Sequence, residues 1–107
     1  MQRRDINAAD APAPAGQYTQ AIEVTEASRT LYISGQVGIA ADGSVPEDAE
    51  AQCALAWQNM QAQLRAAGME IENLVKITTI VRNPADVAKV QAGRAAVLGT
   101  HIGLLAP

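Results

Sequence analysis

The chain is poor in the residues that make covalent cross-links and metal sites. Its 107 residues include a single cysteine, Cys53, and a single histidine, His101. One thiol cannot form an intramolecular disulfide, and a structural zinc site needs four Cys or His ligands. We therefore expect no disulfide and no metal. Cys53 is predicted to be a buried packing residue on a helix, and His101 a surface residue.

Large aromatic side chains are almost absent too. There is no phenylalanine, and Trp57 is the only tryptophan, so the core must be built mainly from Ala, Val, Ile and Leu. A chain of this mass hides roughly 65% of its unfolded surface on folding, which is a modest core. We predict one domain over residues 1–107, with added stability from association between subunits.

Positive charge is also scarce. Eight Lys and Arg residues stand against eleven Asp and Glu, and the net charge is −3. Nucleic-acid binding needs clustered basic residues, so no nucleic-acid partner is expected. No apolar run approaches the roughly 20 residues of a membrane helix, and the N-terminus lacks a signal-peptide pattern. The expected location is the cytoplasm, without a membrane partner.

The β pattern is concentrated in the first half of the chain. Residues 18–24 alternate loosely, and residues 30–37 are rich in β-branched and aromatic side chains, so both are predicted strands. The short connection at 26–29 favours an antiparallel hairpin. Gly35 within the second strand indicates a bulge or a close approach to the backbone. Residues 41–44 predict a turn.

Two helices follow from periodicity and capping. Pro46 is predicted to start a helix of about 20 residues that has one apolar face and ends at Gly68 as a left-handed cap. Trp57 lies on that face and is predicted to pack in the core. Asn83 is the predicted N-cap of a second helix, with Gly99 as its C-cap.

A third strand at residues 74–82 completes the predicted order of elements. A helix between the second and third strands is a crossover that would place them parallel. The sequence therefore predicts an α/β fold in which two helices cover one face of the sheet. Residues 1–16 contain Pro12 and Pro14 and predict an irregular arm, either frayed or lying against a sheet edge. Residues 100–107 are too short to predict a strand.

Five motifs occur in a fixed order along the chain. They are Gly-Gln-Tyr-Thr-Gln-Ala at 16–21, Leu-Tyr-Ile-Ser-Gly-Gln-Val at 31–37, a helix pattern with Glu-Ala-Gln at 50–52, Asn-Met at 59–60 and Leu-Arg-Ala-Ala-Gly at 64–68, Leu-Val-Lys-Ile-Thr at 74–78, and a second helix containing Asp86 and Val90. Together they resemble the RidA/YjgF family of reactive-intermediate deaminases, also called endoribonuclease L-PSP.

This resemblance implies a chorismate-mutase-like, two-layer α+β fold, with a mixed sheet and two helices on one face. It also implies homotrimers whose clefts between subunits bind a small carboxylate such as a keto or imino acid. The implied reaction is the hydrolysis of enamines and small 2-imino acids to 2-keto acids and ammonia. No metal or organic cofactor is implied.

Four positions match ligand-binding positions of the family. The resemblance implies that Tyr18 lines the cleft, that the Ser34 hydroxyl and the Gly35 backbone face the ligand, and that Gln91 replaces an asparagine found in many members. The structural alternatives are a half-buried strand tyrosine at position 18 and a β-bulge at positions 34 and 35.

The catalytic residues stay unassigned. The family arginine that holds the substrate and the glutamate that orients water belong to a pattern that would begin near Ala106 and Pro107. Arg82 and Arg94 do not match it, since one lies at a strand end and the other on a helix. The chain is therefore expected to be either a shortened product of a longer gene or a natural short member, with exposed sheet edges and apolar faces.

Two alternatives to a deaminase remain open. One is a non-catalytic trimer of the same fold that binds a small metabolite. The other is the ribonuclease activity in the older family name, which the acidic charge and the lone histidine disfavour.

Overall fold

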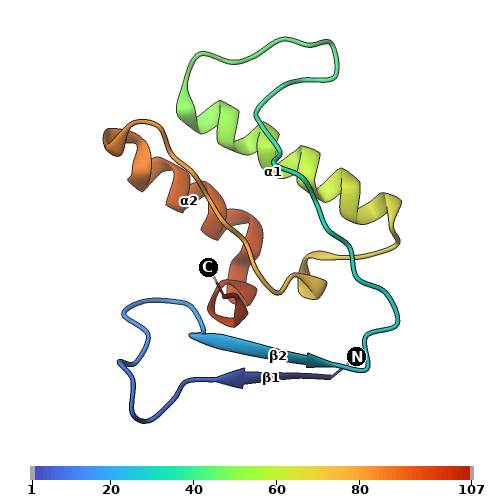
Figure 1. The fold of residues 1–107 in the computed structure, drawn as a ribbon. Coiled ribbons are helices and arrows are strands. Elements are labelled where there is room, and N and C mark those ends of the chain that lie inside the picture. Colours follow the sequence, from blue (N-terminus) through green and yellow to red (C-terminus); the bar gives the residue numbers. More distant parts are fainter. Residues whose placement is uncertain (1, 107) are drawn as a thin grey trace.

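A computed structural model describes residues 2–106, except for the side chains of Ile102 and Leu104. It contains two strands, two long helices and three short 3-10 helices. In chain order they are β1 (Gln2–Ile6), β2 (Ala21–Thr25), α1 (Ala49–Ala66), η1 (Ile71–Asn73), η2 (Pro84–Asp86), α2 (Val87–Leu98) and η3 (Gly99–Leu104). Figure 1 shows the pair of strands on one side of the molecule and the two long helices on the other.

The sheet forms from the N-terminal arm. β1 and β2 are antiparallel, with Arg4 opposite Glu23 and Ile6 opposite Ala21. Arg4 Nη2 lies 3.2 Å from Glu23 Oε2, so an ion pair joins the two strands. The predicted strand at 18–24 is thus present, shifted to 21–25. The expectation of an irregular arm was wrong for residues 2–6, because the prolines that exclude regular structure lie further along.

The predicted hairpin with residues 30–37 does not form. In the structure this segment has no strand, and its side chains are largely exposed, with Tyr32 at 90%. Its continuation instead lies against α1, where Asn59 Nδ2 donates hydrogen bonds to Val37 O at 3.0 Å and Ile39 O at 2.9 Å. A helix side chain therefore satisfies backbone acceptors that a neighbouring strand would satisfy in a sheet. High β propensity alone did not create a strand here.

The third predicted strand, at residues 74–82, is also absent as a regular element. It makes one isolated parallel bridge, between Lys76 and Ala106. Ala106 N donates to Val75 O at 3.0 Å, and Ile77 N donates to Ala106 O at 3.2 Å. The expected parallel pairing of the segments 30–37 and 74–82 is therefore not formed. We call these two the connecting segments below.

Local capping explains where α1 begins and ends. The Asp48 carboxylate accepts a hydrogen bond from Ala51 N at 2.8 Å, so the helix starts three residues after Pro46. At the other end Gly68 has φ +69°, a left-handed conformation that glycine adopts without strain. Met69 N then donates to Leu64 O at 2.8 Å, which closes the last turn as predicted.

The second helix follows the same rules. Asn83 Oδ1 accepts from Ala85 N at 3.0 Å, as expected of an N-cap. The first turn, Pro84–Asp86, is a 3-10 turn, and α2 proper begins at Val87. Gly99 has φ +54° and ends the helix, as predicted.

The core lies where the two helices meet the C-terminal tail. Trp57, Leu98 and Leu105 form its buried centre, and Leu105 is completely buried. Trp57 is confirmed as a packing residue. Cys53 is half-buried beside this cluster, and its Sγ would lie 3.0 Å from a Cβ placed on Gly93. Gly93 thus allows α1 and α2 to approach each other closely.

His101 was expected on the surface, and that expectation was wrong. The side chain is 8% exposed, and Nε2 lies 2.9 Å from Leu74 O. Because a carbonyl oxygen only accepts, Nε2 carries the proton in this contact. Burial with a satisfied hydrogen bond makes His101 part of the connection between the tail and residue 74.

Candidate functional site

Tyr18 lies in the loop that leads into β2. Its side chain is half-buried, and its hydroxyl oxygen accepts a hydrogen bond from Ala15 N at 3.1 Å. The ring also lies 3.9 Å from a Cβ placed on Gly16. The tyrosine is therefore fixed by its own loop, which leaves the hydroxyl proton able to donate to a ligand.

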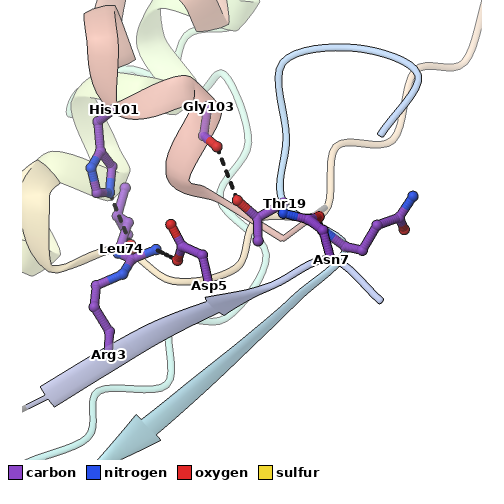
Figure 2. A network of polar contacts seen from close by, with 8 residues as sticks. Arg3, Asp5, Asn7, Thr19, Leu74, His101 and Gly103 are labelled. Atoms are coloured by element: carbon purple, nitrogen blue, oxygen red, sulfur yellow. Dashed lines mark hydrogen bonds and ion pairs between the residues drawn. The ribbon is translucent and has the colours of Figure 1, made fainter. Parts of the chain in front are cut away.

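Thr19 anchors this loop to the C-terminal tail. It is 3% exposed, its Oγ1 donates to Gly103 O at 3.0 Å, and its backbone N donates to Leu105 O at 2.9 Å. Figure 2 shows Thr19 pointing at Gly103 across the gap between the loop and η3. The position of Tyr18 therefore depends on the tail, a link that the sequence motif did not predict.

A second polar cluster fixes β1 to the same region. Arg3 Nη2 lies 3.4 Å from Asp5 Oδ1, and Arg3 Nη1 donates to Leu74 O at 3.4 Å. The Leu74 carbonyl oxygen also accepts a hydrogen bond from His101 Nε2, as Figure 2 shows. Two donors from distant parts of the chain thus share one acceptor. This cluster holds the sheet against the tail.

Ser34 and Gly35 lie in the first connecting segment and are both exposed. Within residues 2–106, one side chain forms a hydrogen bond with Ser34: Gln36 Nε2 donates to the Ser34 backbone oxygen at 3.1 Å. A Cβ placed on Gly35 would meet nothing within 4 Å. Since no strand forms here, the β-bulge predicted at Gly35 is not present. The two residues are accessible to a ligand or to another chain.

Gln91 lies on α2 and is exposed. Arg94, one turn further along, is half-buried, and its Nη1 lies 3.4 Å from Thr79 Oγ1. Residues three apart on a helix lie on the same side of it. Gln91 and Arg94 therefore lie on the same side of α2. Arg94, which the sequence comparison did not match to a family position, contacts the second connecting segment through Thr79.

The structure does not join the four predicted positions by direct contact. Within residues 2–106, no hydrogen bond connects Tyr18, Ser34 and Gln91 to one another. In the described part of the chain, hollows lie beside α1 and between α1 and α2, and none of the four residues lines either of these two. The first is lined by Gln61, Leu64, Arg65, Met69, Glu70 and Ile71, and the second by Glu50, Lys89, Ala92, Gly93 and Ala96.

Among the described residues, no group of three or more His, Cys, Asp or Glu side chains is placed to hold a metal ion. None of the helices described is both long and apolar enough to cross a membrane.

Comparison with known proteins decides the family. A family model described as endoribonuclease L-PSP matches residues 8–103, which is most of the chain. The chain belongs to this family, known also as RidA/YjgF.

Curated relatives agree with this assignment. The RidA-family chain is 39% identical over 79 residues to a RutC family protein of Aquifex aeolicus, covering 73% of this chain and 61% of that protein. It is 37% identical over 90 residues to the 2-iminobutanoate/2-iminopropanoate deaminase of Mus musculus, covering 82% and 64%. The chain thus spans less than two thirds of the length of these two relatives.

Solved structures agree on the fold. The crystal structure of RidA from an Antarctic Psychrobacter superposes with a TM-score of 0.67 at 30% identity, over 96% of this chain and 82% of that one. The predicted α+β, chorismate-mutase-like fold class is therefore confirmed for this RidA-family chain, although both connecting segments lack regular strands.

Proposed function

We propose that this RidA-family chain hydrolyses small 2-imino acids to 2-keto acids and ammonia. The observation that carries the proposal is the 37% identity to the mouse 2-iminobutanoate/2-iminopropanoate deaminase over 82% of this chain. Goat and human proteins of the same name are each 39% identical to this chain. The motifs that carry the resemblance include the positions of Tyr18, Ser34 and Gly35.

The reaction asks little of a protein. Water adds to the imine carbon and forms a carbon–oxygen bond, while the imine nitrogen takes up a proton. The carbon–nitrogen bond of the resulting carbinolamine then breaks, ammonia leaves, and the hydroxyl proton is lost to give the 2-keto acid. The protein therefore has to hold the carboxylate and orient one water, which lowers the entropic cost of the attack.

The four candidate residues suit the binding part of this task. The Tyr18 hydroxyl accepts one hydrogen bond and keeps a proton to donate. The exposed Ser34 hydroxyl and the Gly35 backbone can contact a ligand without rearrangement. The Gln91 carboxamide supplies both a donor and an acceptor. We assign these residues to ligand binding and assign no catalytic residue.

We further propose that the chain works in the cytoplasm as a homotrimer, with its sites in clefts between subunits. Supporting this, four large apolar side chains of the connecting segments and their continuations are well exposed in the single chain. Tyr32 is 90% exposed, Ile80 91%, Val37 59% and Val45 55%. Sedimentation equilibrium or mass photometry tests the trimer, and a stable monomer at micromolar concentration contradicts it.

The deaminase proposal is tested by ammonia release from freshly generated 2-iminopropanoate or 2-aminoacrylate. The purified chain should raise the rate above the spontaneous hydrolysis measured in buffer and with heat-inactivated protein. A rate equal to that of buffer rejects the activity. Tyr18→Phe, which keeps the ring, should lower the rate because it removes the hydroxyl donor.

The second candidate is a non-catalytic binder of the same small acids. The exposed positions of Ser34, Gly35 and Gln91 favour it, because they serve recognition without requiring a general base. Titration calorimetry with a panel of 2-keto acids distinguishes the two, since binding without hydrolysis identifies a binder. Labelled RNA should stay intact, as expected for a chain with net charge −3.

A further inference from the structure

The hollow between α1 and α2, called the helix groove below, has a volume of about 290 Å³. It is lined by Glu50 of α1 and by Lys89, Ala92, Gly93 and Ala96 of α2. The four α2 residues recur at steps of three and four, so they form one stripe along the helix. With 3.6 residues per turn, Gln91 projects from roughly the opposite side of α2. The helix groove is therefore separate from the candidate ligand positions described above.

The floor of the helix groove is made of small residues. Gly93 lies so close to α1 that a Cβ placed on it would be 3.0 Å from Cys53 Sγ. The same Sγ lies 3.8 Å from Val90 O, so the two helices are in contact at the bottom of the groove. Ala92 and Ala96 carry only methyl groups, which leaves the space above this contact open. Pockets for drug-sized ligands hold about 300–1,000 Å³, so this groove suits a smaller molecule with a short apolar group.

Two side chains of opposite charge border the apolar floor. Glu50 lies in the first turn of α1, Lys89 lies near the start of α2, and both are exposed. Within residues 2–106, no ion pair within 4 Å joins them to each other or to another residue. This includes Asp86, which lies three residues before Lys89. A carboxylate and an ammonium group therefore border one hollow without neutralising each other.

These charges favour a ligand that carries both signs. An anion alone is attracted by Lys89 and repelled by Glu50, and for a cation alone the two effects are reversed. A zwitterion is attracted by both side chains, and the low-dielectric walls of a groove strengthen these attractions relative to a flat surface. A free α-amino acid carries an ammonium group, a carboxylate and a side chain on one carbon. It therefore matches the two charges and the apolar floor together.

We propose that the helix groove binds a free α-amino acid with a small aliphatic side chain. Glu50 accepts hydrogen bonds from the ligand ammonium group, and Lys89 donates to the ligand carboxylate. The aliphatic side chain lies on Ala92, Gly93 and Ala96. Because both charged side chains are exposed, each contact is weak, and the expected dissociation constant is about 1–10 mM. The site goes beyond the proposed deaminase, since neither its residues nor an amino acid takes part in imine hydrolysis.

Three ligands of similar size separate the two charged contacts. L-Alanine, L-alaninamide and propionate are titrated into the full chain, and amide chemical shifts are followed by NMR. L-Alanine should give saturable shifts centred on Glu50, Cys53 and residues 89–96. L-Alaninamide lacks the carboxylate and propionate lacks the ammonium group, so each should bind about three- to tenfold more weakly. Equal binding of all three ligands overturns the proposal, as do shifts confined to other regions or no saturable shift up to about 100 mM L-alanine.

Variants then show which side chains hold the ligand. Glu50→Gln and Lys89→Met should each weaken L-alanine binding by about three- to tenfold. Lys89→Met should also make L-alanine and L-alaninamide bind equally, because the carboxylate has lost its partner. Glu47→Gln and Arg82→Met remove the same charges from exposed positions outside the groove and should leave binding unchanged. A native-like Lys89→Met that still prefers L-alanine to L-alaninamide as the natural chain does would show the proposal to be wrong.

Loss of folding and loss of deaminase activity can both be told apart from loss of this site. Ala96→Leu places a larger side chain in the groove at an exposed position and should prevent L-alanine binding. If Glu50→Gln or Lys89→Met does not fold, Ala96→Leu and the three-ligand comparison in the natural chain still decide. Normal L-alanine binding by folded Ala96→Leu overturns the site. L-Alanine binding in the groove without imine hydrolysis supports the site and rejects the deaminase, whereas hydrolysis without L-alanine binding does the reverse.

Discussion

The two long helices and the two connecting segments obey different physical rules. α1 and α2 begin and end at residues whose side chains or glycine conformations satisfy the helix ends, and these interactions are local. The connecting segments carry strong β patterns, yet their backbone groups bond to Asn59, to His101 and to the tail. A helix can therefore be specified by its own sequence, whereas a strand depends on a partner that lies elsewhere.

The exposure of side chains follows the same division. Trp57, Leu64 and Leu98 of the helices are buried, while Tyr32 and Ile80 of the connecting segments are about 90% exposed. The tail joins the two regions, because Leu105 enters the helix core while Ala106 forms the bridge to Lys76. Substitutions in the helix layer and in the connecting segments should therefore have unequal effects on stability.

The largest expected effect comes from the tail. Leu105→Ala removes a fully buried side chain from the centre of the core, and it should lower the free energy of unfolding by about 2–5 kcal/mol. Urea denaturation followed by Trp57 fluorescence measures this. The matched control is Ile80→Ala, measured below the concentration at which subunits associate. It truncates a side chain that is 91% exposed in the single chain and should change stability by less than about 0.5 kcal/mol. Equal losses in both variants would show that the connecting segment is packed in solution.

Helix capping should give the next largest effect. Asp48→Ala removes the carboxylate that accepts from Ala51 N, and it should cost about 0.5–2 kcal/mol. Thermal unfolding followed by circular dichroism at 222 nm measures the loss. Glu47→Ala removes a negative charge beside the same helix start without removing the cap. A similar loss in the two variants would assign the effect to the helix dipole instead of the hydrogen bond.

The attachment of the first connecting segment should be weaker. Asn59→Ala removes the donor shared by Val37 O and Ile39 O, and it should cost about 0.5–1.5 kcal/mol, because water can reach these partly exposed acceptors. Limited proteolysis should show faster cleavage between residues 31 and 45. Gln58→Ala, at an exposed neighbouring position of α1, is the control. Unchanged cleavage in Asn59→Ala contradicts this attachment.

Sequence reasoning succeeded where the deciding interaction is local. The predicted turn at Asp42 and the predicted helix ends at Asn83, Gly68 and Gly99 were confirmed. Each depends on backbone groups that lie within a few residues along the chain. The general course of α1 and the packing role of Trp57 follow from spacing along one helix.

It failed where burial or pairing is decided at long range. His101 is buried, and its Nε2 donates a hydrogen bond to Leu74 O, 27 residues away along the chain. In the same way β1 pairs with β2 instead of fraying. For the candidate site, the sequence identified Tyr18, Ser34, Gly35 and Gln91 through a resemblance. It could not show that Tyr18 is held through Thr19 to the tail, or that Arg94 meets Thr79, because these contacts join residues far apart in sequence.

The smallest expected effect lies in the turn between the first connecting segment and α1. The Ser44 hydroxyl donates to Asp42 Oδ1 at 2.6 Å, and the Ser44 backbone N donates to the same oxygen at 2.9 Å. These bonds, the hydroxyl first, hold the pKa of the Asp42 carboxyl below its ordinary 3.8. Because the folded-state pKa is lowered, the turn gains stability above the unfolded pKa and loses it as the pH falls through the folded value.

Ser44→Ala removes the hydroxyl bond and keeps the backbone bond, so the pKa of Asp42 should rise toward 3.8 without reaching it. A carbon-detected NMR titration of the carboxyl group between pH 2 and pH 6 measures the shift. Ser34→Ala, at a serine whose hydroxyl is not bonded to Asp42, should leave the titration unchanged. Since Asp42 is fully exposed, added salt and solvent compete with these bonds, and the unfolding midpoint of Ser44→Ala should barely change at neutral pH. A titration of Asp42 that is identical in Ser44→Ala and the natural chain would mean that the turn is open in solution and that Asp42 does not accept a hydrogen bond from the Ser44 hydroxyl there.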